Sequence, residues 1–193
     1  MPTPLTTAAP QQATAASGFT HAGTQTTTRP ATLDDFDGVN ALHERCSLQT
    51  RFARYQAARR SLRLAEFQHL TRPDRSLTWV THPMDDPQQL VATTNLVRTT
   101  EPGAAELGIM IEDSWQSRGL GTSLVRYARA QARAFGCSSL VVMTGADNVR
   151  ILKIMSALGV TLPAVHSSTV DLTVPVGEPV EFTVAAALPR PVR

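Results

Sequence analysis

The chain has 193 residues, an apolar fraction of 42% and a formal net charge of +2 at pH 7. This length suits one domain with a sizeable core and is short for two. The small net charge does not indicate a nucleic-acid or membrane partner, and we expect neither. No apolar run reaches the length of a membrane-spanning helix, and no secretory signal is evident, so we expect a cytoplasmic protein.

The N-terminal third begins with a segment of low apolar content. Residues 1–24 are mostly Pro, Thr, Ala, Gln and Ser, so we expect a disordered tail. The threonine-rich run Gln25–Pro30 predicts the first strand. Thr32 to Asp35 then resembles a capping box, and the apolar spacing that follows predicts a helix from about Leu33 to Arg45.

An arginine-rich segment, Ser47–Leu70, follows and is predicted to be helical. Its arginines form either a solvated helix face or a rim that contacts an anionic ligand or an acidic protein surface. They are Arg51, Arg54, Arg59, Arg60 and Arg63. The side chains expected to face inward are Phe52, Tyr55, Leu62, Leu64 and Phe67.

The middle of the chain predicts a three-stranded antiparallel meander. Its strands are Leu77–Thr81, Leu90–Arg98 and Glu106–Ile111, separated by Pro- and Gly-containing turns. A helix over Leu120–Phe135, ended by Gly136, and an apolar strand over Ser139–Thr144 complete a βαβ unit.

The C-terminal part predicts one further helix and two strands. They are Asn148–Leu158, Val165–Val174 and Val180–Ala186, before a short tail at residues 188–193. The order of elements indicates a single α/β (α+β) domain with a mixed, mostly antiparallel sheet, spanning residues 25–187.

The cysteines and the helical histidine carry no motif. Cys46 and Cys137 have no metal-ligand spacing, so we expect no metal and two buried free thiols; a single disulfide is the alternative. His43 has no partner motif, so a role in packing or at the solvent-exposed surface is favoured over catalysis.

The stretch from Ala105 to Thr122 carries the chemistry. A strand runs into the glycine-bearing turn Gln116–Gly121, and this turn opens a helix. Free N–H groups at a helix N-terminus can hold a diphosphate. Glu106 opens the strand a few residues earlier and is a candidate base. Together they indicate a transferase that uses a phosphorylated cofactor.

These residues resemble the GNAT acetyltransferases. Gln116–Gly121 (QSRGLG) matches the family signature Q/R-x-x-G-x-G/A, and Asn148–Gly159 resembles the family's second motif, an Asn-led helix ending in Leu-Gly. The order of elements also agrees. With RCSLQTRFARY at residues 45–55 and HLTRPD at residues 69–74, the chain is similar to the acetyltransferase domains of bacterial Pat-type protein lysine acetyltransferases.

The resemblance implies a fold and a cofactor. It implies a GNAT fold with helices on both faces and acetyl-CoA bound where the fourth and fifth strands splay apart. The pantetheine arm would pair with the fourth strand and the diphosphate would rest on the glycine loop. The cofactor-binding residues implied are Ile109, Met110, Ile111, Gln116, Ser117, Arg118, Gly119, Leu120, Gly121, Thr122 and Asn148.

The resemblance also implies direct acetyl transfer to a primary amine, with Glu106 as general base. One position departs from the family: Met155 stands where many members have a Tyr that protonates the leaving thiolate. Three functions stay open. The first is an N-acetyltransferase that acts on protein lysine, the second acts on a small-molecule amine, and the third is a non-catalytic CoA-binding sensor. The sequence does not decide between monomer and dimer.

Overall fold

Seven strands form one mixed sheet in the computed structural model, which describes residues 16–19, 25–163 and 167–177. The strands lie in the sheet in their chain order, and every neighbouring pair is antiparallel except β5 and β6. The predicted mostly antiparallel sheet is therefore confirmed. The strands are β1 (Ala16–Phe19), β2 (Gln25–Pro30), β3 (Ser76–Pro83), β4 (Ala92–Arg98), β5 (Ala104–Ile111), β6 (Ser139–Gly145) and β7 (Thr169–Pro175).

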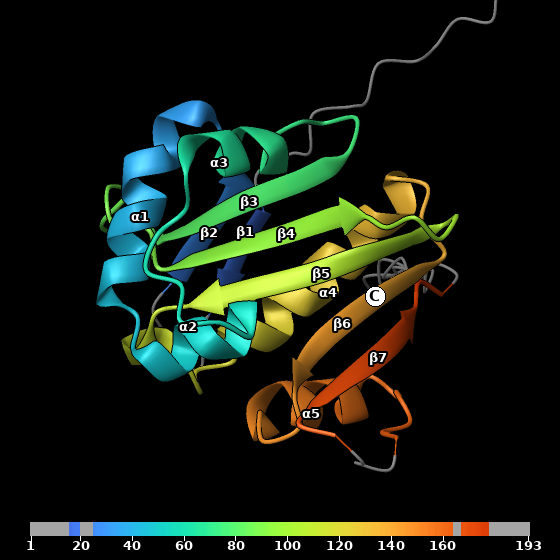
Figure 1. Ribbon diagram of the computed structural model, residues 1–193. Coiled ribbons are helices and arrows are strands. Elements are labelled where there is room, and N and C mark those ends of the chain that lie inside the picture. Colours follow the sequence, from blue (N-terminus) through green and yellow to red (C-terminus); the bar gives the residue numbers. More distant parts are fainter. Residues whose placement is uncertain (1–15, 20–24, 164–166, 178–193) are drawn as a thin grey trace, which may run out of the picture.

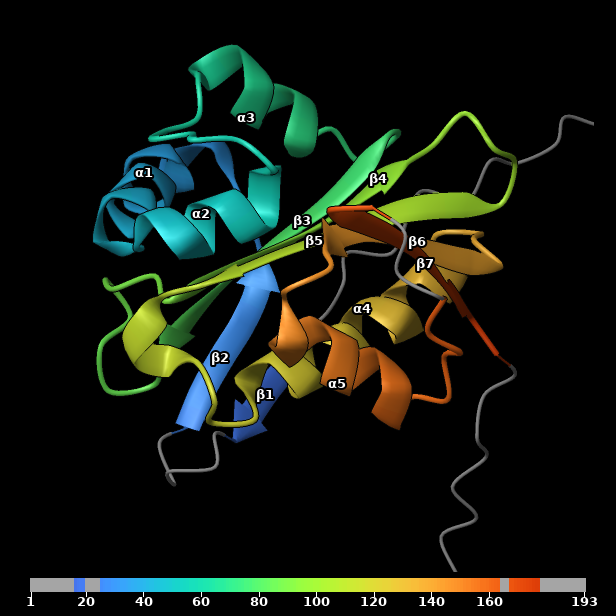
Figure 2. The same cartoon turned by 60° about the horizontal axis from the view of Figure 1, so that its bottom comes forward.

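Helices cover both faces of the sheet, as predicted. Helices α1, α2 and α3 lie on one face, and α4 and α5 lie on the other (Figure 2). The larger core packs α4 and α5 against the sheet around Trp79, Leu96 and Leu140. The helical elements are the 3-10 turns η1 (Leu33–Asp35) and η2 (Asp113–Trp115), and the helices α1 (Phe36–Arg45), α2 (Leu48–Tyr55), α3 (Leu64–Leu70), α4 (Leu120–Ala134) and α5 (Val149–Ala157).

Strands β5 and β6 pair only at one end. Their parallel register covers Ala104–Glu106 against Ser139–Val141, whereas β5 pairs with β4 from residue 105 to residue 111. Beyond Glu106 the two strands separate, and the opening between them widens along β5 (Figure 1). The predicted splay of these two strands is confirmed.

Two helices flank this opening, and both stop at the glycines that the sequence predicts. Helix α4 turns Leu120, Leu124 and Ala128 into the core, and Gly136 follows it with φ +79°. Helix α5 is followed by Gly159 with φ +81°. Glycine adopts this left-handed conformation without steric cost, which explains why both helices stop there.

Two predictions in the first part of the chain are wrong. Residues 16–19, expected in a disordered tail, form β1 and pair with β2. The single helix predicted for Ser47–Leu70 is two helices, because Gln56 takes a left-handed conformation with φ 51° and ends α2. Phe52 and Leu64, which were expected to face inward, are each 49% exposed.

At the other end, the predicted strand Val165–Val174 corresponds to β7 in its described part. The strand predicted at Val180–Ala186 and the tail at residues 188–193 lie outside the described residues. Within the described residues, no helix is both long and apolar enough to span a membrane.

The cysteines and His43 belong to the core. Cys46 and Cys137 are both buried free thiols, and burial raises the pKa of Cys46 to about 12. His43 is fully buried, and its Nδ1–H donates to the Val39 carbonyl at 2.7 Å. Its Nε2 then accepts a hydrogen bond from the Tyr55 hydroxyl at 2.6 Å, which ties α1 to the end of α2. The predictions of free thiols and a packing role are confirmed.

An ion pair fixes the start of α1 to the sheet. The Arg29 guanidinium donates to both carboxylate oxygens of Asp35 at 2.8 and 2.6 Å, and the Thr32 N–H donates to the same carboxylate at 2.8 Å. Burial opposes ionisation of Asp35, but these donors outweigh it and hold the pKa of Asp35 below its ordinary value.

We expect Asp35→Asn to destabilise the protein in a pH-dependent way. Because the folded-state pKa is lowered, the carboxylate stabilises the fold above the unfolded-state pKa, about 3.9, and this contribution is lost as pH falls through the lower folded value. The cost should be about 1–3 kcal/mol at pH 7 and shrink steadily below pH ~3.9. Urea unfolding from pH 7 to pH 2 measures it. The exposed Asp85→Asn is the control, and a cost of Asp35→Asn that did not change with pH would contradict the assignment.

Candidate active site

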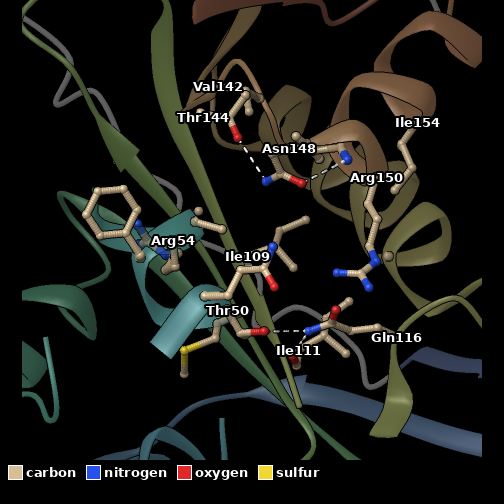
Figure 3. Close-up of a pocket in the computed structure, with 18 of the residues that line it drawn as sticks. Thr50, Arg54, Ile109, Ile111, Gln116, Val142, Thr144, Asn148, Arg150 and Ile154 are labelled. Atoms are coloured by element: carbon tan, nitrogen blue, oxygen red, sulfur yellow. Dashed lines mark hydrogen bonds between the residues drawn. The ribbon is translucent and has the colours of Figure 1, made fainter. Parts of the chain in front are cut away.

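A cleft of about 1230 Å³ lies in the opening between β5 and β6. Strand β5, helix α2, the glycine loop, the end of β6 and the first turns of α5 form its walls (Figure 3). The predicted base, Glu106, lines it. So do most of the predicted cofactor-binding residues, namely Ile109, Met110, Ile111, Gln116, Ser117, Gly119, Gly121, Thr122 and Asn148.

Strand β5 presents unpaired backbone to this cleft. The Glu112 N–H donates to the Val91 carbonyl on the β4 side at 2.9 Å, in register with β4. Because backbone groups in a strand point to alternate sides, Met110 also faces β4, while Ile109 and Ile111 face the cleft. The Ile111 carbonyl accepts from Gln116 at 2.8 Å. Of these three residues, Ile109 thus keeps both backbone groups available for an extended ligand.

The glycine loop presents helix-end donors at the opposite wall. Ser117 and Gly119 take left-handed conformations with φ 59° and 86°, and Gly119 precedes the first turn of α4. The first N–H groups of a helix, here from Leu120 to Thr122, have no intrahelical acceptor, and no described side chain caps this end. With the positive end of the helix dipole, they form a site suited to a diphosphate.

Side chains fasten helix α2 to this loop. The Gln116 amide Nε2 donates to the Thr50 hydroxyl at 2.9 Å. The Asp113 carboxylate accepts from the Ser47 N–H at 2.7 Å and from the hydroxyls of Ser47 and Thr50, each at 2.8 Å. Burial disfavours the charged form of Asp113, but these donors prevail and the pKa of Asp113 lies below its ordinary value. The two walls of the cleft are therefore joined where α2 begins.

Asn148 caps helix α5, as predicted. Its Oδ1 accepts from the Ile151 N–H at 3.4 Å, and its Nδ2 donates to the Thr144 hydroxyl at 3.0 Å (Figure 3). These bonds hold the side chain at the rim of the cleft, between the end of β6 and the start of α5. A direct contact between Asn148 and the cofactor stays a prediction.

Three positions singled out in the sequence have side chains outside the cleft. The Arg118 guanidinium lies over the Trp115 ring, 5.6 Å from its centroid. Leu120 is 2% exposed and packs in the core, so only its backbone can serve the loop. Met155 is fully buried in the main core, so the position of the absent Tyr does not face the cleft. Ile151 and Ile154 line the cleft instead.

Glu106 lies where two cavities meet. It lines the cleft and also a second cavity of about 440 Å³ beneath the α2–α3 segment. Met110, on the same face of β5, packs against Leu42 and Cys46 beneath α1, so the Glu106 side chain points toward the α1–α3 layer. The carboxylate is half-buried and has no hydrogen-bond or ion-pair partner among the described residues.

Further lining residues were not among the predicted site residues. Arg54 and Thr50 come from α2, and Arg150 extends from α5 into the pocket (Figure 3). Arg150 follows Asn148 by two positions, so the helix motif could have indicated it. Arg54 and Thr50 lie more than fifty residues from either motif, and only packing of α2 on β5 brings them here.

Comparisons with known proteins agree with this geometry. The sequence model described as "Acetyltransferase (GNAT) domain" matches residues 26–161. The fold is similar to that of the GNAT domain of S. lividans PAT, with 19% identity and a TM-score of 0.72 over 82% of this chain and 95% of that one. This similar domain agrees with the resemblance to Pat-type enzymes.

Two other solved structures share the fold at low identity. One is yncA from Salmonella typhimurium, determined with its cofactor acetyl-CoA, at 16% identity and a TM-score of 0.64 over 80% of this chain and 96% of that one. The other is an N-acetyltransferase from Staphylococcus aureus Mu50, at 14% identity and a TM-score of 0.61 over 79% of this chain and 99% of that one.

We expect Gly119→Ala to weaken CoA binding about tenfold, because a left-handed Ala costs about 1–2 kcal/mol and the loop would reshape to relieve it. Calorimetric titration with CoA measures the affinity. Gly159→Ala is the matched control: its φ is +81°, and it lies at the far end of α5 with space around its Cα. It should lower the melting temperature and leave CoA affinity unchanged. Equal effects of both variants on CoA affinity would contradict a role for the loop.

Proposed function

Because the chain belongs to the GNAT acetyltransferase family, we propose that it is an acetyl-CoA-dependent N-acetyltransferase with Glu106 as general base. The observation that carries the proposal is the position of Glu106, whose side chain lines both the cofactor cleft and the second cavity. A carboxylate between two cavities can receive a proton from an amine that enters one while the acetyl donor occupies the other.

The residues of the cleft suit acetyl-CoA. The loop N–H groups from Leu120 to Thr122 would hold its diphosphate, and the free backbone of Ile109 would pair with the amides of its pantetheine arm. When bound, acetyl-CoA supplies an acetyl group activated as a thioester. Backbone N–H groups of β5 would polarise its carbonyl.

The acceptor is a primary amine, which is protonated near neutral pH if its pKa is about 8 to 10.4. An ammonium has no lone pair, so Glu106 would take a proton before the nitrogen can attack. The second cavity gives the amine a path to Glu106 from the face opposite α4 and α5. Protein lysine and small-molecule amines are the two acceptor classes to distinguish.

We expect Glu106→Gln to lower kcat by about 100-fold or more, because general-base catalysis contributes about 10²–10⁴-fold. CoA affinity should stay unchanged, since Glu106 is not among the loop groups. Thiol-reagent detection of released CoA measures turnover, and the buried Cys46 and Cys137 add little background. The control is Glu101→Gln in the exposed β4–β5 turn.

Full turnover in Glu106→Gln would remove this residue from the mechanism. Absence of turnover in the wild-type protein with every acceptor, together with CoA binding, would favour a CoA-binding sensor. Lys153 is the only lysine, so Lys153→Arg leaves the N-terminal amine as the only amine for autoacetylation and defines the assay background.

A further inference from the structure

Arg54 and Glu106 are oppositely charged, and both line the cleft and the second cavity. The ion pairs between described residues are Arg29–Asp35, Arg45–Glu112, Arg59–Glu66 and Arg72–Asp74. Neither Arg54 nor Glu106 belongs to them. A cation and a carboxylate thus border the same space without neutralising each other.

The Arg54 side chain is half-buried, and its guanidinium makes few hydrogen bonds. It lies over Gly108 of β5, where an added methyl group would overlap it. Its Nε is buried without a hydrogen-bond partner among the described residues, and its Nη2 makes one long bond, 3.4 Å, to Oδ1 of Asn95. A half-buried guanidinium with no anionic partner among the described residues can bind a carboxylate through charge-assisted hydrogen bonds, so this position suits a bound anionic group.

The spacing of the two charges suits a single small molecule. Glu106 and Gly108 lie on the same face of β5, two residues and therefore about 7 Å apart. Arg54 lies over Gly108, so its guanidinium and the Glu106 carboxylate border neighbouring positions. A molecule with an ammonium and a carboxylate on neighbouring groups can reach both.

The surrounding residues hold Arg54 in place. Tyr55 lies beneath two guanidinium groups, with Arg54 at 4.9 Å and Arg59 at 5.1 Å from its ring centroid. The Tyr55 hydroxyl donates to His43, whose pKa burial lowers, so that the neutral ring can accept. Arg59 is neutralised by Glu66, so of the two arginines that line the second cavity Arg54 is the one without an ion-pair partner among the described residues.

We propose that the acceptor is a small amine with a carboxylate beside its amino group, of the α-amino-acid type, whose carboxylate binds Arg54 while its ammonium faces Glu106. This inference rests on the proposed function. Glu106 takes one proton from the ammonium, and the nitrogen forms a bond to the acetyl carbon as the carbon–sulfur bond breaks. The sulfur leaves with that electron pair and takes the second amine proton; Glu106 releases the first to solvent.

A protein lysine fits this pair of charges less well. Its amine stands at the end of a four-carbon chain with no carboxylate beside it, so Arg54 would keep no anionic partner. The second cavity, about 440 Å³, is within the range of small-molecule sites.

The test measures kcat/KM at saturating acetyl-CoA for three acceptor sets. They are the common α-amino acids, their α-amides, and lysine-containing peptides with blocked termini. The best amino acid should exceed its own amide by at least about 100-fold, because the amide leaves Arg54 unpaired.

Variants assign this preference to Arg54. Arg54→Gln should raise KM for the best amino acid at least about 30-fold and so remove most of the preference for the acid over its amide. Arg54→Lys should restore part of the preference. Arg60→Gln is the matched control, because Arg60 is exposed and lines neither cavity; it should behave as wild type.

Other results overturn the inference. Amides used as well as acids, or lysine peptides used best, would refute it and leave the proposed function standing. A preference for succinyl-CoA over acetyl-CoA that Arg54→Gln removes would show that Arg54 recognises the acyl group instead. Absence of turnover with every acceptor would refute the proposed function and this inference with it.

Discussion

The loss of pairing between β5 and β6 beyond Glu106 is the constraint on which the rest of the structure depends. A parallel pair that ends after three residues leaves backbone N–H and C=O groups of β5 without a partner strand. The structure satisfies one of them with the Gln116 side chain and leaves those of Ile109 facing a cleft. The same separation makes room for α2 on one side and for the start of α4 on the other, so that sheet, loop and helix converge on one opening.

The alternation of side chains along β5 gives this opening two different faces. Ile109 and Ile111 direct their side chains toward α4 and their backbone toward β6, which suits an extended cofactor. Glu106, Gly108 and Met110 face the helices α1–α3, where the second cavity and Arg54 lie. Because successive side chains of a strand point to opposite faces, neighbouring residues of β5 would form the cofactor surface and the acceptor surface that we propose. The hydrogen bonds of Asp113 and Gln116 with the start of α2 hold α2 in a fixed position relative to the glycine loop.

Prediction from the sequence succeeded where a local rule decides the conformation. The glycine ends of α4 and α5, the Asn148 cap and the strands of the meander all follow from the preferences of a few adjacent residues. It failed at Gln56, where a non-glycine residue takes a left-handed conformation that no periodicity reveals. It also failed for residues 16–19, because their pairing with β2 depends on the exposed edge of a sheet and not on their own composition.

For the site, the sequence by itself determined the glycine loop, the carboxylate at position 106 and the family of the fold. These features lie in short, continuous stretches of sequence whose conformation depends on a few adjacent residues. Tertiary structure alone decided which side chains meet in the cleft. It buried Met155 in the core, turned Arg118 onto Trp115, and brought Arg54 over Gly108 from more than fifty residues away. Packing of α2 on β5 is a long-range contact, and side-chain direction on a helix depends on what that helix covers; neither property is contained in local spacing.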